Sequence, residues 1–184
     1  MTRPSREYLL SLLRYDPVTG VFTWLPRTPD MFVGRAGRYS AERQCAIFNS
    51  TFAGKTAGGA NERGYVKIGV EGVSYYAHVL AWVLVKGTWP DRNIDHANGL
   101  TGDNRFGNLR LAKKTDNLRN SKKPVTNKSG FKGVCRPKDR TKWIAQIRID
   151  GRNTYLGSFN TPEEAHEVYR QAALQHFGAF ARFV

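Results

Sequence analysis

A basic segment without apolar periodicity, residues 122–130, limits how this chain can fold. It places Pro124 and Gly130 among lysines and small polar side chains, a composition typical of a linker. A chain of 184 residues can form one medium domain or two small ones. We therefore predict two domains, residues 1–121 and residues 131–184, joined by this linker.

The charge of the chain is strongly positive and unevenly distributed. Lys and Arg number 29 against 15 Asp and Glu, which gives a net charge of +14. Residues 110–148 alone hold thirteen of the basic residues and two of the acidic ones. Such a concentration favours a polyanionic partner. No long basic amphipathic helix lies there, so nucleic acid is expected as the partner and a membrane surface is not.

The cysteines and the apolar segments indicate the cellular compartment in which the protein is expected. Cys45 and Cys135 are too few for a zinc cluster and suggest a reducing compartment. The longest apolar stretch, residues 77–85, is too short to span a bilayer, and the first residues show no signal-peptide pattern. An intracellular, cytoplasmic protein is expected.

The first predicted domain combines short helices and strands. Leucine spacing predicts a helix over residues 6–14, and a mostly apolar segment predicts another over residues 77–86. Alternating apolar side chains predict a hairpin with strands at 64–70 and 73–76. Further on, a strand is expected to end at Asp95-His96.

The region between the first helix and the hairpin has fewer signals. The sequence Asp16-Pro17-Val18-Thr19-Gly20 is typical of a turn, and a strand is expected at 21–24. Residues 26–62 are rich in Gly, Arg, Ser and Thr and show no clear period. They are interpreted as a long ordered loop or a substrate-facing arm.

The second predicted domain has a simple pattern of three strands and one helix. The strands are expected at residues 131–136, 143–150 and 154–159. The sequence Thr161-Pro162-Glu163-Glu164 has an N-cap residue, a proline at the first helical position and a capping-box glutamate. It predicts a helix that continues toward Phe177. The fold class expected for the chain is α+β.

Four short groups of polar residues form a composite pattern. They are Ile94-Asp95-His96-Ala97-Asn98-Gly99, Asp103-Asn104-Arg105, Asn108-Leu109-Arg110 and Asn117. The pattern resembles the HNH homing endonuclease family, in the variant whose last position is Asn instead of His. The resemblance extends to residues 75–82 and to the turn at 16–20, and covers about residues 8–121. It implies a ββα-metal fold, with its core at about 90–121, and a homing-type or mobile phage endonuclease, acting at the host nucleoid if phage-encoded.

The residue types fit that chemistry. Hydrolysis of a phosphodiester can be achieved with one metal ion and one imidazole. Neighbouring side chains on a strand point in opposite directions, so Asp95 can face a metal while His96 faces a water molecule. We expect His96 to be the general base. Asn108 is expected to accept a hydrogen bond from the other ring nitrogen of His96 and so to fix its tautomer.

A metal site is expected from oxygen donors. A short helix is expected to begin near Thr115, which can act as its N-cap. Asp95 and Asn117 are the predicted ligands, and Asn120, three residues further along this helix on the same face, is the alternative to Asn117. Carboxylate and amide oxygens suit Mg²⁺ or Mn²⁺ and disfavour zinc. No small-molecule cofactor is expected.

Other polar residues near the pattern have simpler interpretations. Asn98, Asp103 and Asn104 are ordinary turn residues and are expected to be structural. His78 lies in an apolar helix and is expected to be a core histidine with satisfied hydrogen bonds.

Residues 127–184 resemble a second family, the AP2/ERF DNA-binding domain. The matching groups are Gly130-Phe131-Lys132-Gly133-Val134, Trp143-Ile144-Ala145-Gln146-Ile147-Arg148, Tyr155-Leu156-Gly157-Ser158-Phe159, Thr161-Pro162-Glu163-Glu164-Ala165 and Ala179-Phe180-Ala181-Arg182-Phe183. The resemblance implies a three-stranded antiparallel sheet packed on one helix.

A twisted sheet of this kind can enter the major groove of DNA. The side chains expected on the DNA face are basic or aromatic: Lys132, Arg136, Lys138, Arg140, Lys142, Arg148, Arg152 and Tyr155. Trp143, Ile147, Leu156 and Phe159 are expected to pack on the helix, with contact to a DNA sugar as the alternative for Trp143.

Three classes of function remain open at the level of sequence. The first is a metal-dependent DNA endonuclease, nicking or cutting both strands of double-stranded DNA and acting as a monomer. The alternative is a catalytically inert, sequence-specific DNA-binding regulator. The third is a nucleic-acid-compacting protein, which only the charge supports.

Overall fold

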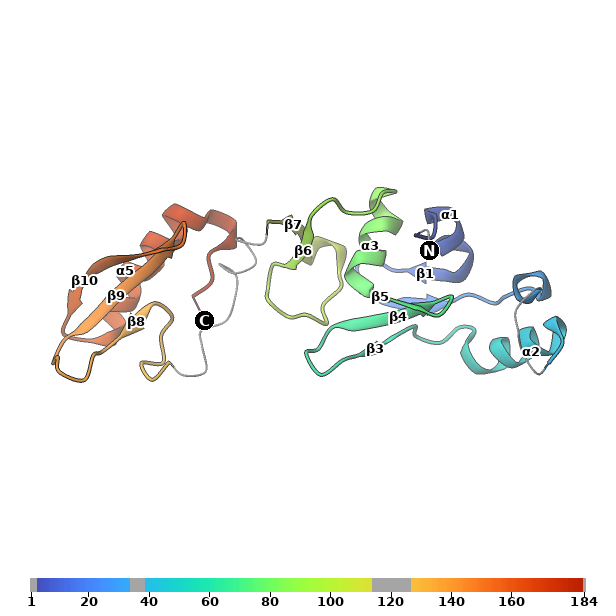
Figure 1. The fold of residues 1–184 in the computed structure, drawn as a ribbon, viewed down its shortest axis with the longest axis horizontal. Coiled ribbons are helices and arrows are strands. Elements are labelled where there is room, and N and C mark those ends of the chain that lie inside the picture. Colours follow the sequence, from blue (N-terminus) through green and yellow to red (C-terminus); the bar gives the residue numbers. More distant parts are fainter. Residues whose placement is uncertain (1–2, 34–38, 114–126, 184) are drawn as a thin grey trace. The chain divides into compact units, whose positions relative to one another are not determined.

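The computed structural model describes residues 3–33, 39–113 and 127–183 (Figure 1). The chain divides into two compact units, residues 1–111 and residues 112–184. Each mixes helices and strands, in agreement with the predicted α+β class. The predicted linker lies outside the described residues except for residues 127–130.

The first unit contains three described helices and seven short strands. The helices are α1 (Arg6–Leu12), α2 (Ala41–Phe52) and α3 (Ala77–Lys86). The strands are β1 (Leu13–Tyr15), β2 (Phe22–Trp24), β3 (Gly59–Ala60), β4 (Val66–Val70), β5 (Val73–Tyr76), β6 (Asn93–His96) and β7 (Leu109–Ala112). They form three small sheets, β1–β2, β3–β4–β5 and β6–β7.

Local sequence explains where the main elements begin and turn. Ser5 caps α1, because its hydroxyl accepts a hydrogen bond from the Tyr8 amide at 3.1 Å. The predicted hairpin is confirmed, with β4 and β5 paired antiparallel around Glu71-Gly72. Both turn residues have positive φ, 51° and 76°, as a tight two-residue hairpin turn requires.

The core of the first unit is where α1, α3 and β4 meet. Leu9, Leu12, Ile68 and Leu80 are at most 1% exposed there. Ile94 of β6 and Leu109 of β7 join the same cluster. The two strands that carry the HNH-like residues are therefore anchored to the core of the unit.

The prediction of a loop over residues 26–62 is wrong in part. A 3-10 helix covers Pro29–Phe32, and α2 begins after Ser40, whose hydroxyl accepts a hydrogen bond from the Arg43 amide. The guanidinium of Arg27 lies 3.8 Å from the centroid of the Phe48 ring. Contacts between aromatic and cationic side chains thus take the place of an aliphatic core here. Because such contacts do not require regularly spaced apolar residues, the sequence shows no periodic pattern over this region.

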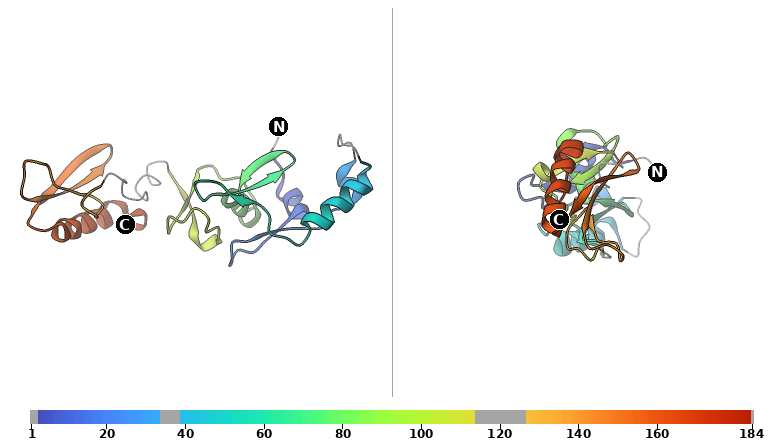
Figure 2. Two further views of the ribbon diagram at one scale, coloured as in Figure 1. Left: turned by 90° about the horizontal axis from the view of Figure 1, so that it is seen from below. Right: turned by 90° about the vertical axis from the view of Figure 1, so that its left-hand side faces the viewer.

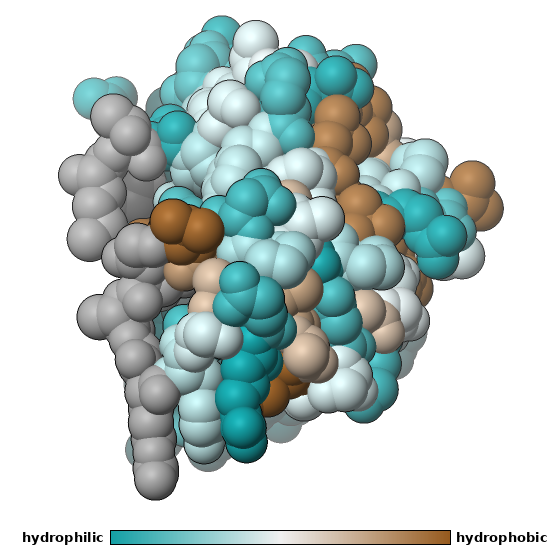
Figure 3. Space-filling view, turned by 90° about the vertical axis from the view of Figure 1, so that its right-hand side faces the viewer, coloured by the Kyte–Doolittle hydropathy of each residue, from teal (hydrophilic) through white to brown (hydrophobic). Residues whose placement is uncertain are grey.

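The part of the first unit around α2 exposes several large hydrophobic side chains. Ile47 and Phe52 of α2 are 44% and 45% exposed. Figure 3 shows hydrophobic side chains in small groups among hydrophilic ones on this side of the molecule.

The second unit is built on one sheet. Its strands are β8 (Val134–Cys135), β9 (Trp143–Ile149) and β10 (Arg152–Phe159), antiparallel in the order β10–β9–β8. Helix α5 (Pro162–Phe177) lies along one face of this sheet (Figures 1 and 2). Ala145 and Ile147 of β9 are buried against Ala165, Tyr169 and neighbouring residues of α5.

The start of α5 follows its sequence signal. The Thr161 hydroxyl accepts a hydrogen bond from the Glu164 amide at 3.2 Å, and the Glu164 carboxylate accepts one from the Thr161 amide at 3.3 Å. The predicted capping box is confirmed. No helix in the described ranges is long and apolar enough to cross a membrane.

Candidate active site

Strand β6 ends in two buried polar side chains, Asp95 and His96. Asp95 is 9% exposed and His96 is 4% exposed. The neighbouring strand β7 supplies Arg110, whose Nε and Nη2 both donate to Asp95 Oδ2, at 2.9 and 2.7 Å. A carboxylate, its guanidinium partner and an imidazole therefore lie together at one end of the β6–β7 pair.

The His96 ring is held among aromatic side chains. It meets the His78 ring nearly edge-on, with centroids 5.0 Å apart and an interplanar angle of 86°. Tyr65 lies 6.0 Å away at 61°. Burial lowers the pKa of His96, and Asn104, Asp95 and Asp103 oppose that shift only partly. The ring is therefore neutral near pH 7, as a proton acceptor must be.

His78 is a core residue, as predicted, but its hydrogen bonding differs from the prediction. It is 7% exposed, and within the described part of the chain its Nδ1 is buried without a hydrogen-bond partner. Burial, with a smaller contribution from His96, lowers the pKa of His78 to about 4. His78 is accordingly a second neutral imidazole beside His96.

Asn108 braces a loop instead of contacting His96. Its Oδ1 accepts a hydrogen bond from the Asn98 amide at 3.0 Å, and its Nδ2 donates to the Asp103 carbonyl at 2.8 Å. The Asn104 side chain instead faces the His96 ring, with its Oδ1 3.5 Å from Nε2. The predicted contact between Asn108 and His96 is corrected accordingly.

The loop between β6 and β7 is closed by its own polar side chains. The Asn98 amide nitrogen donates to Asp103 Oδ2 at 2.7 Å. Arg105 donates to both carboxylate oxygens of Asp103 and, as the main cause, holds the pKa of this carboxyl well below its usual range. The structural interpretation of Asn98 and Asp103 is confirmed. Asn104 is different, because it is 4% exposed and faces the site.

The predicted metal ligands are only partly within the described residues. Asn117 and the alternative Asn120 lie outside them. Across residues 3–33, 39–113 and 127–183, no three His, Cys, Asp or Glu side chains are grouped so as to hold a metal ion. Asp95 fits the expected donor set in chemical type, because a carboxylate oxygen is a ligand that Mg²⁺ and Mn²⁺ prefer. Its Oδ2 is paired with the Arg110 guanidinium in this structure, so a bound cation would share the carboxylate with Arg110.

In the second unit, part of the predicted DNA face lies on the open side of the sheet. Arg148 pairs with Asn153, and Tyr155 pairs with Gln146. Cross-strand partners share a face, and these four residues are exposed on the side away from α5. The guanidinium of Arg136 lies 4.8 Å from the Trp143 ring centroid.

A groove of about 630 Å³ lies on this second unit. Its lining includes Lys128, Arg136, Trp143 and Gln146. The exposed residues Lys138, Arg140 and Lys142 belong to the segment between β8 and β9.

Two of the predicted DNA-face residues lie elsewhere. Arg152 pairs with Ile149, whose side chain packs on the α5 side of the sheet. Lys132 is half-buried, and burial followed by the nearby Arg182 lowers its pKa to about 8. The predicted packing of Trp143, Ile147, Leu156 and Phe159 toward the helix is confirmed.

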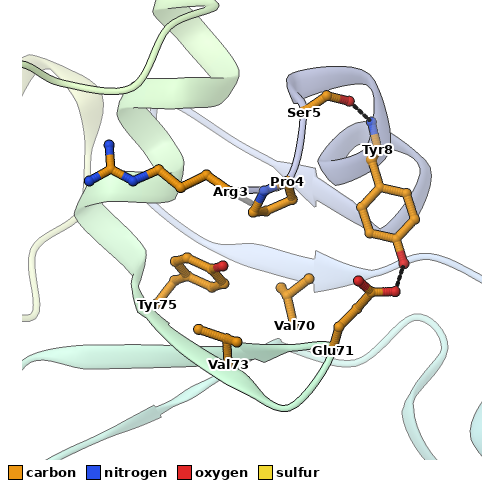
Figure 4. A pocket seen from close by; sticks show the side chains of 8 residues that line it. All are labelled: Arg3, Pro4, Ser5, Tyr8, Val70, Glu71, Val73 and Tyr75. Carbon is orange, nitrogen blue, oxygen red and sulfur yellow. Dashed lines mark hydrogen bonds between the residues drawn. The ribbon is translucent and has the colours of Figure 1, made fainter. Parts of the chain in front are cut away.

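A separate pocket of about 480 Å³ lies between the N-terminal segment and the β4–β5 hairpin (Figure 4). Tyr8 donates a hydrogen bond to Glu71 at its edge, and Arg3 and Tyr75 line it. None of its lining residues belongs to the group around His96, so this pocket is not the candidate active site.

Sequence reasoning missed the roles of Arg110 and Asn104. Arg110 lies within the Asn108-Leu109-Arg110 group, on the strand expected to return beside Asp95. Pairing of these two strands would have predicted the contact between Arg110 and Asp95. Asn104 carried no such signal, because its burial depends on how the whole loop closes.

Comparison with known proteins identifies the domain that carries these residues. Residues 75–119 match the HNH endonuclease family, so the chain carries an HNH endonuclease domain. It is 34% identical over 107 residues to "Protein 3.8" of Escherichia phage T7, an alignment that covers 58% of this chain and 88% of that protein. The chain belongs to the same family as that phage protein.

A solved structure of the HNH homing endonuclease I-HmuI, described as "DNA binding and cleavage by the HNH homing endonuclease I-HmuI", is also similar. The match covers 90% of this chain and 85% of the other, with 16% sequence identity and a TM-score of 0.39. A likeness of this size supports no conclusion about the site. The resemblance to the HNH family is confirmed, and the resemblance to the AP2/ERF domain stays a prediction.

Proposed function

We propose that the chain is a metal-dependent DNA endonuclease of the homing or mobile phage type. The observation that carries this proposal is the pairing of a buried, neutral His96 with a buried Asp95 at the end of β6, inside an HNH endonuclease domain. The net charge of +14 supports a nucleic acid as the substrate, because a strongly basic chain attracts a polyanion.

His96 is the general base in this proposal. A neutral imidazole accepts the proton of the water molecule that attacks the phosphorus. Packing against His78 and Tyr65 restricts the orientation of the His96 ring. Asn108 contributes by holding the loop that follows β6 through its bonds to Asn98 and Asp103.

Asp95 and Asn117 are proposed to hold Mg²⁺ or Mn²⁺. A bound divalent cation neutralises charge on the phosphate and stabilises the departing oxygen. Arg110 positions the Asp95 carboxylate, because its two hydrogen bonds go to a single oxygen.

The second unit is proposed to bind double-stranded DNA. Its open sheet face and the adjoining segment present basic and aromatic side chains beside a groove. Positive side chains on such a surface contact phosphates and supply affinity and register. The proposed set is Arg136, Lys138, Arg140, Lys142, Arg148 and Tyr155, with Arg136, Arg148 and Tyr155 best placed. Lys132 and Arg152 are left out of it, because they lie elsewhere on the second unit.

Cleavage of supercoiled plasmid by the full chain tests this function. We expect conversion to nicked or linear DNA with Mg²⁺ and none with EDTA. Binding of the plasmid without conversion, in either Mg²⁺ or Mn²⁺, would contradict the nuclease proposal and favour the inert DNA-binding regulator.

A further inference from the structure

Asn104 is a buried polar residue whose side chain joins the loop to the His96 ring. Its Nδ2 donates to the Gly102 carbonyl at 3.1 Å. Because the amide nitrogen faces that carbonyl, the amide oxygen is the atom directed at His96 Nε2, 3.5 Å away. Asn104 is 4% exposed, so water does not readily replace it as the partner of the ring.

This orientation selects one tautomer of the ring. An amide oxygen only accepts hydrogen bonds, so the nitrogen that faces it must carry the hydrogen. In a neutral imidazole with hydrogen on Nε2, the lone pair that can take a proton is on Nδ1. The separation of 3.5 Å is at the long end of the range for a hydrogen bond.

The turn at residues 16–20 holds Asn104 in place. The Tyr15 hydroxyl donates to the Asn104 carbonyl at 2.7 Å, and the Phe106 amide donates to the Pro17 carbonyl at 2.9 Å. Gly20 has a φ of +75°, and a Cβ there would lie 2.6 Å from the Asn104 carbonyl carbon. The turn therefore packs directly against the backbone of the loop. This contact gives a structural role to the turn sequence at residues 16–20, which takes no part in the proposed chemistry.

We infer that Asn104 is a positioning residue that fixes His96 as the Nε2–H tautomer, and that the Tyr15–Gly20 segment fixes Asn104. The consequence for cleavage rests on the proposed function. The tautomer itself does not, because it is a property of the folded protein and can be observed without DNA or metal.

The direct test is a two-bond ¹H–¹⁵N correlation spectrum of the imidazoles of the full chain, with His96 assigned by comparison with His96→Gln. We expect the native His96 signal to have the Nε2–H pattern. Asn104→Leu, which has a similar volume and no acceptor, is expected to give a mixture of tautomers. Asn104→Asp keeps an acceptor and is expected to preserve the native pattern.

Two further variants keep the inference testable if Asn104→Leu does not fold. Tyr15→Phe removes only the hydroxyl that holds the Asn104 carbonyl, and is expected to shift the tautomer in the same direction by a smaller amount. Ser74→Ala changes an exposed residue of β5, outside the β6–β7 loop, and is expected to leave the His96 pattern unchanged. A native Nδ1–H pattern, or a native pattern retained in folded Asn104→Leu, would overturn the inference.

Cleavage separates this inference from the function on which it rests. In single-turnover reactions, Asn104→Leu should lower the rate by roughly 10- to 100-fold, part of what general-base catalysis contributes, with DNA affinity unchanged. A neighbouring carboxylate raises the pKa of an imidazole, so Asn104→Asp should restore most of the rate only at a pH high enough to keep His96 neutral. If the native protein fails to cleave DNA, only the proposed function is contradicted. If the His96 tautomer is the same in the native protein and in Asn104→Leu, only this inference is contradicted.

Discussion

Arg110 donates two hydrogen bonds to one oxygen of Asp95, from Nε at 2.9 Å and from Nη2 at 2.7 Å. The two side chains are only 21% and 10% exposed. The pair joins β6 to β7 beside His96, and it supplies a buried carboxylate with the charge partner that burial requires. A guanidinium suits this role better than an ammonium, because its donors are fixed in one plane.

Replacement of Arg110 is expected to destabilise the first unit. Arg110→Ala leaves the Asp95 carboxylate without this partner, and hydrogen bonds to a charged group contribute about 1.5–3 kcal/mol. Urea unfolding should show a loss of that size, with Arg110→Lys intermediate. Arg105→Ala, which removes an exposed partner of Asp103, is the control and should change stability much less. Equal effects of the two alanine variants would contradict the structural role given to Arg110.

Asp95→Asn is expected to weaken metal binding. The amide keeps an oxygen donor but loses the negative charge, so affinity for Mn²⁺ should fall by about tenfold or more. Electron paramagnetic resonance of free Mn²⁺ measures this without any cleavage reaction. Asp91→Asn, at an exposed position before β6, is the matched control. Unchanged Mn²⁺ affinity in Asp95→Asn would remove Asp95 as a ligand.

The buried His78 predicts how stability depends on pH. Its pKa is about 4 in the folded protein against an ordinary value of 6.5, so the unfolded chain binds the proton more readily. Its contribution to stability is complete above pH 6.5 and is lost as the pH falls toward 4, up to roughly 3 kcal/mol. The free energy of unfolding in urea should decline over that range, and less steeply in His78→Phe. Parallel declines in the two proteins would show that His78 is not the group responsible.

The sheet surface of the second unit predicts a salt-dependent contribution to DNA binding. Arg148→Ala should weaken binding and reduce the slope of log affinity against log salt by about one phosphate contact. Arg170→Ala changes a basic residue of α5, on the opposite side of the sheet, and should leave the slope unchanged. Identical slopes for both variants and the native chain would contradict DNA binding by this face.

The sequence predicted those parts of the molecule that depend on local signals. The capping residues Thr161 and Glu164 locate the start of α5, and the alternation in β4 and β5 locates the hairpin. The adjacent Asp95 and His96 are predicted correctly at the end of a strand, because strand geometry and residue type agree there.

Features that depend on tertiary contacts could not be predicted in the same way. Helix α2 is held by the Arg27 side chain against Phe48, a contact without periodicity. Asn104 and not Asn108 lies beside the His96 ring, because the closure of the loop between β6 and β7 decides which asparagine is turned toward it. Arg110 meets Asp95 only through the pairing of two strands.

The central claim is that His96 takes the proton from the attacking water. Its most direct test is the single-turnover cleavage rate of a DNA substrate by the native chain and by His96→Ala, with the affinity for the same DNA measured in parallel. We predict a loss of about 100-fold or more in rate, with the affinity unchanged. A His96→Ala variant that cleaves as fast as the native chain would contradict the account.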